Sequence, residues 1–475
     1  MSESFIQYTS ERIAHWNNIG KSFETDRSLG GGYHKILQTY YRSIIPKNMK
    51  VLELGCGEGN LLAALKPGHG VGVDFSSVMI QRAQKRYPHI SFIEADAHDF
   101  IIEGQFDYII ISDLLNDLWD VQIVLNHLKR YCYPETKIVF NFFSRVWELP
   151  LQMARIAKLA RPLLQQNWFS MTDVKDILYL TDYEIIKSGS EILFPFKIPM
   201  INCVINSFMS KFWPFNLLNF TAVVVARPKP YTVKDPVKVS IVVAARNEEG
   251  HILDIIRRTP EMGSHTELIF IEGGSSDNTW WAIERGIEEN PDRDIKCARQ
   301  DGKGKGDAVR KGFAMASGDV LMILDADMTV APEDLPKFYD AWISGRAEFV
   351  NGVRLVYPME KEAMRFFNLL GNKFFSLAFS WVLDQSIKDT LCGTKVLSRQ
   401  HYENISENRQ FFGNFDPFGD FDLIFGASKL NLKILDLPIR YHSRNYGETN
   451  ISRWSHGAIL LKMLIFAARK LKFRC

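Results

Sequence analysis

The sequence predicts an α/β protein of two consecutive domains, each built on a largely parallel sheet, and three observations support this prediction. Short apolar runs alternate with helix-forming stretches over residues 51–113, and the first run ends in a glycine-rich turn. A second series begins at Val239 and reaches a strand-length run over 318–327. A proline-rich, charged junction at 227–236 separates the two series. Alternating strands and helices are typical of parallel sheets, and such junctions commonly join domains.

Length, charge and cysteine content narrow the class of protein. At 475 residues the chain is long enough for two domains with separate cores. The formal net charge of +2 is nearly balanced, so nucleic acid is not an expected partner. The six cysteines lack the paired spacing of a zinc site, which favours a reduced, cytoplasmic protein. The charged N-terminus argues against a secretory signal, and no window of about twenty apolar residues predicts a membrane span.

The first domain is expected to open with a strand over 51–54 that breaks into a glycine-rich turn before a helix over 60–66. Glycine allows positive φ there and lets the backbone pass close beneath a ligand. The turn glycines are Gly55, Gly57 and Gly59. Acids close the three later runs of this series, at Asp74, Asp96 and Asp113. An acid at the end of the second strand could hold ribose hydroxyls.

This order, E-x-G-x-G-x-G, then an acid, then Ala-Asp, makes residues 30–228 resemble the class I S-adenosylmethionine-dependent methyltransferases. The resemblance implies a Rossmann-like sheet that closes with an antiparallel hairpin over 183–187 and 219–226. It also implies S-adenosylmethionine as cofactor, and it does not identify the acceptor. The implied contacts are Glu53, Gly55, Gly57 and Gly59 around the methionine part, Asp74 on the ribose, Asp96 near the adenine and Asp113 beside the methyl-transfer cleft. Two structural alternatives stay open: Gly59 could serve helix packing, and Asp113 could cap the next helix.

The second domain is expected to start with a strand over 239–245 and a second strand over 267–272. The loop 302–306 places two lysines close in sequence to Asp325 and Asp327, which flank one small residue. In a continuing strand these two acids would point in opposite directions, so a shared ligand requires a bend. A divalent cation carrying a diphosphate would suit such a pair. Alternatively the acids merely end the strand before a helix near Pro332, and the lysine loop is a surface turn.

Four segments in order, V-S-I-V-V-A-A-R-N-E, E-G-G-S-S-D-N-T, G-K-G-K-G and D-A-D, make residues 238–455 similar to inverting family 2 glycosyltransferases. The similarity is to the polyprenyl-phosphate, dolichol-phosphate mannose synthase-like branch and implies a GT-A nucleotide-sugar-binding sheet. The implied donor contacts are Ala245, Arg246, Glu248 and Glu272 around the nucleoside, Lys303 and Lys305 at the diphosphate, and Asp325 and Asp327 on Mg²⁺ or Mn²⁺. The chain has Glu272-Gly273-Gly274-Ser275 where the family often has Asp-Asp-Gly-Ser, so the base preference stays open.

The same resemblance places acceptor chemistry after the D-A-D segment. Asp420 or Asp422 could be the general base for a hydroxyl acceptor, with Asp327 as the third catalytic candidate. A phosphate acceptor would instead need cations, which Lys395, Arg440, Arg444 and Arg453 could supply. Arg453 could equally be a solvated surface charge. His442 could contact the metal or the donor phosphate, although a lone histidine is more often structural.

Three apolar stretches bear on membrane contact. The stretch 193–215 is interrupted by prolines and lysines, so it is a lid, a domain interface or a lipid-contacting surface. The stretch 364–381 is either core or membrane-contacting. The tail 457–475 ends in a basic cluster without acids, which favours contact with a membrane interface over packing on a partner helix.

The leading hypothesis is a bifunctional enzyme of one glycan or glycolipid pathway. Residues 1–228 would form the methyltransferase domain, 229–237 a linker and 238–475 the glycosyltransferase domain. The second domain would transfer a sugar from a nucleotide-sugar donor, with inversion and metal dependence, to a polyprenyl-phosphate or glycan acceptor, at the cytoplasmic face of a membrane. Two alternatives are a membrane-peripheral glycosyltransferase with a non-catalytic cofactor-binding scaffold, and a nucleotidyltransferase.

Overall fold

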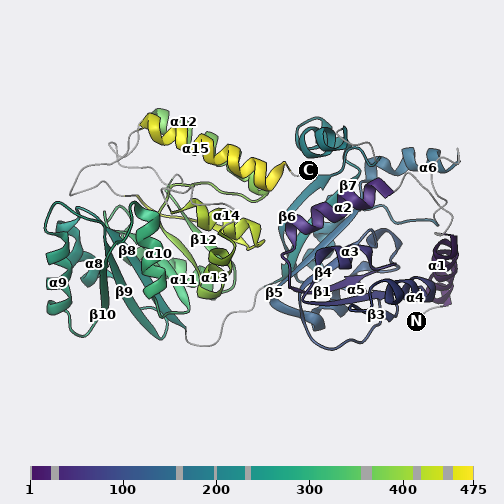
Figure 1. Cartoon of the computed structure of the whole chain (residues 1–475), viewed down its shortest axis with the longest axis horizontal. Helices are drawn as coiled ribbons and strands as arrows, with labels where there is room; N and C mark the ends of the chain where they lie inside the picture. Colours follow the sequence, from purple (N-terminus) through teal and green to yellow (C-terminus); the bar gives the residue numbers. More distant parts are fainter. Residues whose placement is uncertain are drawn as a thin grey trace. The chain divides into compact units, whose positions relative to one another are not determined.

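The chain divides into two compact units, unit 1 (Met1–Lys229 with Lys472–Cys475) and unit 2 (Pro230–Leu471). The division falls inside the proline-rich junction at 227–236. The computed structural model in Figure 1 describes residues 3–22, 31–156, 164–196, 201–229, 237–354, 366–409, 419–441 and 453–473. Each unit contains one sheet of seven described strands with its own core, as expected for two independently packed α/β domains.

Unit 1 has the strand order β3-β2-β1-β4-β5-β7-β6, in which β7 runs antiparallel to both neighbours and the other described pairs are parallel. Its strands are β1 (Lys50–Leu54), β2 (His69–Asp74), β3 (Ser91–Glu94), β4 (Phe106–Ser112), β5 (Cys132–Phe143), β6 (Tyr183–Glu191) and β7 (Thr221–Pro228). Its described α-helices are α1 (Glu3–Ser22), α2 (Gly31–Ile44), α3 (Asn60–Leu65), α4 (Ser77–Arg86), α5 (Val121–Leu128), α6 (Glu148–Ile156) and α7 (Met171–Leu180). The antiparallel hairpin predicted near the end of this domain is therefore present as β6 and β7.

Helices cover both faces of the unit 1 sheet. Leu52 and Leu54 belong to the core that includes α5 and α7, whereas Val51 belongs to the core that includes α2, α3 and α4. This split follows from the strand period, since successive side chains point to opposite faces. Side chains cap the N-termini of helices in this unit. For example, Ser76 Oγ accepts the Met79 N–H at α4, and the Asp120 side chain accepts two N–H groups at α5.

Unit 2 has the strand order β10-β9-β8-β11-β13-β12-β14, in which β13 is antiparallel to β11 and β12. Its strands are β8 (Lys238–Ala245), β9 (His265–Glu272), β10 (Asp294–Arg299), β11 (Val320–Asp325), β12 (Phe349–Val353), β13 (Lys395–Ser398) and β14 (Ile434–Pro438). Its described α-helices are α8 (Ile252–Arg258), α9 (Thr279–Glu289), α10 (Lys305–Met315), α11 (Leu335–Ile343), α12 (Phe366–Leu383), α13 (Arg399–Glu407), α14 (Phe421–Lys429) and α15 (Arg453–Ala467). Parallel β8, β9, β10 and β11 all end at one edge, which is where the predicted donor residues follow.

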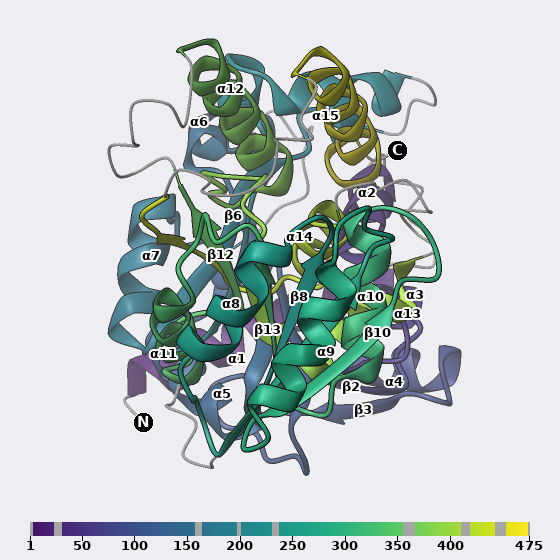
Figure 2. The ribbon, with the colours of Figure 1, turned by 90° about the vertical axis from the view of Figure 1, so that its left-hand side faces the viewer.

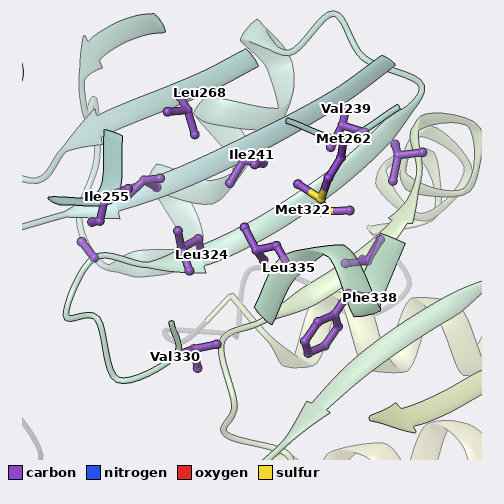
Figure 3. Packing of buried hydrophobic residues seen from close by; sticks show 14 of the residues in the cluster. Val239, Ile241, Ile255, Met262, Leu268, Met322, Leu324, Val330, Leu335 and Phe338 are labelled. Carbon is purple, nitrogen blue, oxygen red and sulfur yellow. The ribbon is translucent and has the colours of Figure 1, made fainter. Parts of the chain in front are cut away.

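The core of unit 2 lies between the sheet and helices α8, α9 and α11. Figure 3 shows Ile241 and Met322 from neighbouring strands in the same layer as Leu335 and Phe338 of α11. Helix α10 packs on β8 from the other side, where a Cβ at Gly312 would lie 2.3 Å from Val242 Cγ1. Only glycine permits this approach, so α10 packs closely on β8.

Helices α12 and α15 contact each other within unit 2, and Figure 2 shows them as neighbouring helices. Apolar side chains of this pair remain exposed, including Leu377 of α12 at 74% and Ile465 of α15 at 47%. None of the helices in the described part of the chain combines the length and apolarity needed to cross a membrane.

Candidate functional site

The turn between β1 and α3 uses its glycines in two different ways. Gly55, Gly57 and Gly59 have φ values of +68°, +51° and +72°, which L side chains rarely adopt. A Cβ at Gly59 would also lie 2.5 Å from Phe92 Cζ, so this glycine is needed for packing. A Cβ at Gly57 would have no atom within 4 Å. The open space beside Gly57 suits a ligand lying against the turn.

Two carboxylates, the buried Glu53 and the half-buried Asp74, hold this turn in place. Glu53 accepts the Leu62 N–H at 3.0 Å and so supports the first turn of α3. Burial raises the pKa of Glu53 to about 8, although the bond from Leu62 opposes the shift. Asp74 accepts the Gly57 N–H and the Ser76 N–H, each at 2.9 Å, and burial raises its pKa despite both bonds. The structure therefore brings Asp74 against the open part of the turn and places Glu53 under the helix.

Asp96 lies just beyond the carboxyl end of β3 and is paired with His98. Its Oδ1 is 2.6 Å from His98 Nδ1 and also accepts the His98 N–H at 2.8 Å. Asp120 N–H donates to His98 Nε2 at 3.2 Å, so Nε2 is the acceptor and Nδ1 carries the proton toward Asp96. Burial raises the pKa of Asp96, but the bonds from His98 outweigh it and leave that pKa below the ordinary value.

Asp113, directly after β4, is the centre of a polar network. Its Oδ1 accepts from Tyr33 Oη at 2.7 Å and from Asn141 Nδ2 at 2.5 Å. The network continues from Asn141 Oδ1 to Tyr41 Oη at 2.8 Å, and from Tyr33 Oη to Thr221 Oγ1 at 3.2 Å. Burial raises the pKa of Asp113 to about 7 against both hydrogen bonds. The carboxylate thus bonds across the sheet and not to the turn Leu115–Asp117 that follows it.

Sequence reasoning missed the other members of this network. Asn141 was open to detection, because it is a polar residue inside the apolar run of β5. Tyr33 lies 80 residues before Asp113, and no local pattern connects the two positions.

In unit 2 the predicted nucleoside residues follow β8 and β9, which are neighbouring parallel strands. Ala245 O accepts the Gly273 N–H at 2.9 Å, which joins the two strand ends. Glu272 is buried and accepts the Ser275 N–H at 2.5 Å. Glu248 is also buried and lies 3.0 Å from His251 Nδ1, whereas Arg246 is exposed. The structure brings these four predicted residues to one edge, with Arg246 as their exposed cation.

The backbone bends directly after β11, as a shared ligand for the two acids requires. Strand β11 ends at Asp325, and Met328 has a φ of +55°. Asp327 Oδ1 accepts from Thr329 N at 3.2 Å and from Thr329 Oγ1 at 2.7 Å. The turn Pro332–Asp334 that follows has no side-chain cap, so the Asp327 and Thr329 side chains stabilise the bend and not that helix start.

Lys305 is the lysine that reaches Asp325. Its Nζ donates to Asp325 Oδ1, while Lys303 is exposed in the preceding loop. A Cβ at Gly393 would lie 2.1 Å from both Lys305 Nζ and Asp325 Oδ2, so a larger residue there would displace the ends of these two side chains. Burial lowers the pKa of Lys305, but the Asp325 and Asp420 carboxylates outweigh it and raise that pKa above the usual range. Burial disfavours the charged carboxylate of Asp325, yet Lys305 and other cations hold its pKa below the ordinary value.

The structure separates the two candidate bases. Asp420 is buried, and its carboxylate lies 3.9 Å from Lys395 Nζ. Its charge also helps to raise the pKa of Lys305. Asp422 lies instead 3.8 Å from Arg310 and 3.5 Å from Arg409. Asp420 is thus the one that joins the Lys305–Asp325 pair. Lys395 is fully buried and also donates to Cys392 O, so it contacts this carboxylate and not solvent.

A further buried ion pair stands beside this cluster. Arg354, at the end of β12, donates to Asp389 through Nε at 2.7 Å and Nη2 at 2.9 Å. The Arg354 guanidinium also lies 5.3 Å from the Tyr441 ring centroid. Sequence reasoning did not identify this ion pair. The pair anchors the segment that carries Gly393 and Lys395.

The predicted acceptor cations are described only in part. Arg444 and His442 lie outside the described residues. Arg453 begins α15, but its side chain is not among those described. Arg440 is exposed after β14.

The acids of the bend suit a hard cation whose coordination is shared with a ligand. Mg²⁺ typically takes one or two protein carboxylates together with substrate phosphates. In the part of the chain that the structure describes, no cluster of three or more His, Cys, Asp or Glu could hold a metal by itself. Asp325 and Asp327 would therefore need diphosphate oxygens to complete a Mg²⁺ or Mn²⁺ site.

Comparison with known proteins agrees with both halves. The family "Methyltransferase domain" matches residues 45–183, and "Glycosyl transferase family 2" matches residues 240–405. The chain carries a methyltransferase domain followed by a family 2 glycosyltransferase domain. The predicted fusion and fold class are thereby confirmed.

Individual relatives cover one half each. A dolichol-phosphate mannosyltransferase from Pyrococcus furiosus is 28% identical over 218 residues, 45% of this chain and 59% of that protein, so the match spans less than two thirds of it. Glycosyltransferase AglJ from Haloferax volcanii is 28% identical over 236 residues, 49% of this chain and 73% of that protein. An S-adenosylmethionine-dependent methyltransferase structure from Thermotoga maritima aligns with a TM-score of 0.34 at 14% identity, over 45% of this chain and 95% of that one.

Proposed function

We propose that the chain is a bifunctional transferase: unit 1 transfers a methyl group from S-adenosylmethionine, and unit 2 transfers a sugar from a nucleotide sugar. The observation that carries the proposal for unit 2 is the Lys305–Asp325 pair under Gly393, beside Asp327 and Asp420. A half-buried lysine and several carboxylates at the edge where β8, β9 and β11 end suit a metal-bound diphosphate.

In unit 2, the exposed Arg246 and the buried Glu272 would bind the nucleoside, and Lys303 and Lys305 the diphosphate. Asp325 and Asp327 would hold Mg²⁺ or Mn²⁺, which when bound would neutralise the charge that develops on the leaving nucleoside diphosphate. The acceptor would attack the anomeric carbon from the opposite side, with inversion.

The acceptor we favour is a polyprenyl phosphate, because the Pyrococcus relative is named a dolichol-phosphate mannosyltransferase. Such an acceptor is already ionised and would be bound by cations such as Arg444 and Arg453. The exposed apolar faces of α12 and α15 support peripheral contact with a membrane surface. For a glycan acceptor, Asp420 held by Lys395 would take the hydroxyl proton.

In unit 1, the open turn at Gly57 and the adjoining Asp74 would cradle the methionine and ribose parts of S-adenosylmethionine. When bound, the cofactor supplies an electrophilic methyl group on sulfur. The chain would chiefly position the acceptor beside Asp113.

A panel of nucleotide sugars tests unit 2 on the full chain, with thermal stability measured with and without Mn²⁺. A bound donor raises the unfolding temperature by mass action. We expect stabilisation by one class of nucleotide sugar only when Mn²⁺ is present, followed by release of nucleoside diphosphate with a lipid-phosphate acceptor. Release of pyrophosphate would instead indicate a nucleotidyltransferase. S-adenosylmethionine binding without methyl transfer to any lipid or sugar extract would leave unit 1 as a scaffold.

A further inference from the structure

Among the described residues, hydrogen bonds reach the Asp113 carboxylate on one oxygen only. Tyr33 and Asn141 both donate to Oδ1, and Oδ2 receives no hydrogen bond from any residue that the structure describes. Asp113 is half-buried at the carboxyl end of β4, and its φ of +54° turns the chain out of the strand there. Oδ2 is therefore the oxygen that can meet a ligand.

The two donors are themselves held by further partners. Asn141 Oδ1 accepts from Tyr41 Oη at 2.8 Å, which turns the amide nitrogen of Asn141 toward Asp113. Tyr33 Oη is 3.2 Å from Thr221 Oγ1 at the start of β7. Elements α2 and β5 thus each donate one hydrogen bond to the carboxylate, and β7 supports it through Tyr33. Such rigid support is typical of a group that must meet a reacting atom in one geometry.

The class of acceptor follows from whether the acceptor atom must lose a proton before it can attack the methyl group. A neutral amine attacks a methyl group through its lone pair and can lose its proton afterwards. A hydroxyl is a weak nucleophile until a base takes its proton, and an efficient base has a pKa near the working pH. Burial places the pKa of Asp113 at about 7, so a large fraction of the carboxylate can accept a proton near neutral pH.

We propose that unit 1 methylates a hydroxyl group, with Asp113 Oδ2 as the general base and with Tyr33 and Asn141 as positioning residues that hold Oδ1. This inference rests on the proposed methyltransferase function. As the acceptor O–H proton passes to Asp113 Oδ2, the oxygen forms a bond to the methyl carbon and the S–CH₃ bond breaks. The electron pair of the broken S–CH₃ bond stays on sulfur, so the products are a methyl ether, S-adenosylhomocysteine and a protonated Asp113.

The first test measures methyl transfer by the full chain from tritium-labelled S-adenosylmethionine to a chloroform–methanol and aqueous extract of cells that express it. For Asp113→Asn we expect kcat to fall by about 100-fold or more, with S-adenosylhomocysteine binding unchanged in calorimetry. Tyr33→Phe removes a bond that favours the charged carboxylate, so the acid limb of its pH–kcat profile should move to higher pH. The matched control is Tyr131→Phe, which also removes one buried tyrosine hydrogen bond, to Phe100 O at 2.9 Å. The Tyr131→Phe variant should have the kcat of the wild type and the same acid limb in its pH–kcat profile.

The labelled product identifies the acceptor atom. An alkali-stable, non-basic product excludes a methyl ester and a methylamine, and so agrees with the ether that the proposal requires. Label released as methanol by alkali, or retained on a basic nitrogen, would overturn the hydroxyl assignment while leaving methyl transfer established. Unchanged kcat and pH profile in Asp113→Asn would overturn the role of Asp113. Cofactor binding without any transfer by the wild type would overturn the proposed function, and this inference with it.

A second readout needs neither cofactor nor acceptor. The folded-state pKa of Asp113, about 7, lies above the unfolded value near 4. Between these values the folded chain keeps a proton that the unfolded chain releases, so this group makes unit 1 less stable as pH rises. Asp113→Asn removes that contribution, and its unfolding temperature relative to wild type should rise between about pH 5 and 7. A difference that is constant with pH would contradict the environment assigned to Asp113.

Discussion

Replacing Asp389 with alanine is expected to destabilise unit 2 by about 3–5 kcal/mol, the cost of breaking a buried ion pair. The Asp389 carboxylate is 2% exposed and the Arg354 side chain 13% exposed. Asp389 accepts two bonds from the guanidinium, at 2.7 and 2.9 Å, and two from the backbone N–H groups of Arg354 and Leu391, at 3.1 and 3.0 Å. Its loss leaves a buried cation and two buried donors without their acceptor. Most of the cost is therefore desolvation that nothing offsets.

The double variant Arg354→Met/Asp389→Leu separates this explanation from simple loss of packing. Because it removes both charges together, we expect it to recover most of the lost stability. Hydrogen exchange of the full chain measures both variants: the slowest amides of β8 and β11 report opening of unit 2, and those of β1 and β4 serve as the internal control in unit 1. A loss below about 1 kcal/mol, the range of exposed ion pairs, would refute the reasoning. So would a double variant no more stable than Asp389→Ala.

Three further outcomes are expected. Asp327→Ala should abolish sugar transfer and the Mn²⁺-dependent rise in unfolding temperature while S-adenosylhomocysteine binding persists; an active variant would contradict the metal assignment. Glu53→Gln should flatten the fall in unit 1 stability between about pH 5 and 8, because the folded-state pKa of about 8 exceeds the unfolded one and the folded chain retains a proton there. Gly57→Ala should lower the free energy of unfolding by about 1–2 kcal/mol, because alanine disfavours the left-handed φ at this position. Gly59→Ala should lower it by about 1–3 kcal/mol more, because the added Cβ would also collide with Phe92. Urea unfolding measures both variants, and equal losses would contradict the packing role of Gly59.

The sequence predicted the parts of each site that short-range patterns encode. Glycines after β1 and acids at the ends of β2 and β3 stand next to the apolar runs that form those strands. Their positions follow from local rules, because parallel strands end at one edge of a sheet. The bend after Asp325 follows from the shared-ligand hypothesis, since two acids that flank one residue in a continuing strand point in opposite directions.

Residues brought together by long-range packing were not predictable in this way. Asn141 donates to Asp113 from 28 residues away, and Arg354 meets Asp389 across 35 residues that include α12. The choice between Asp420 and Asp422 also required the structure. Residues two apart at the start of a helix point in different directions, so one carboxylate faces Lys395 and the other does not.

The strand order of unit 1 has a consequence for how the chain is made. Among the described strands, β6 pairs with β7 alone. Strand β7 is the later of the two in the chain, although it lies between β5 and β6 in the sheet. During synthesis on the ribosome, β6 emerges before the strand that connects it to the sheet exists. Unit 1 can complete its sheet only once Pro228 has left the exit tunnel, when the first residues of unit 2 are already being added. A pause in translation at the stage when Pro228 has emerged and β8 is still inside the tunnel would thus let the first sheet close before β8 offers it a competing strand.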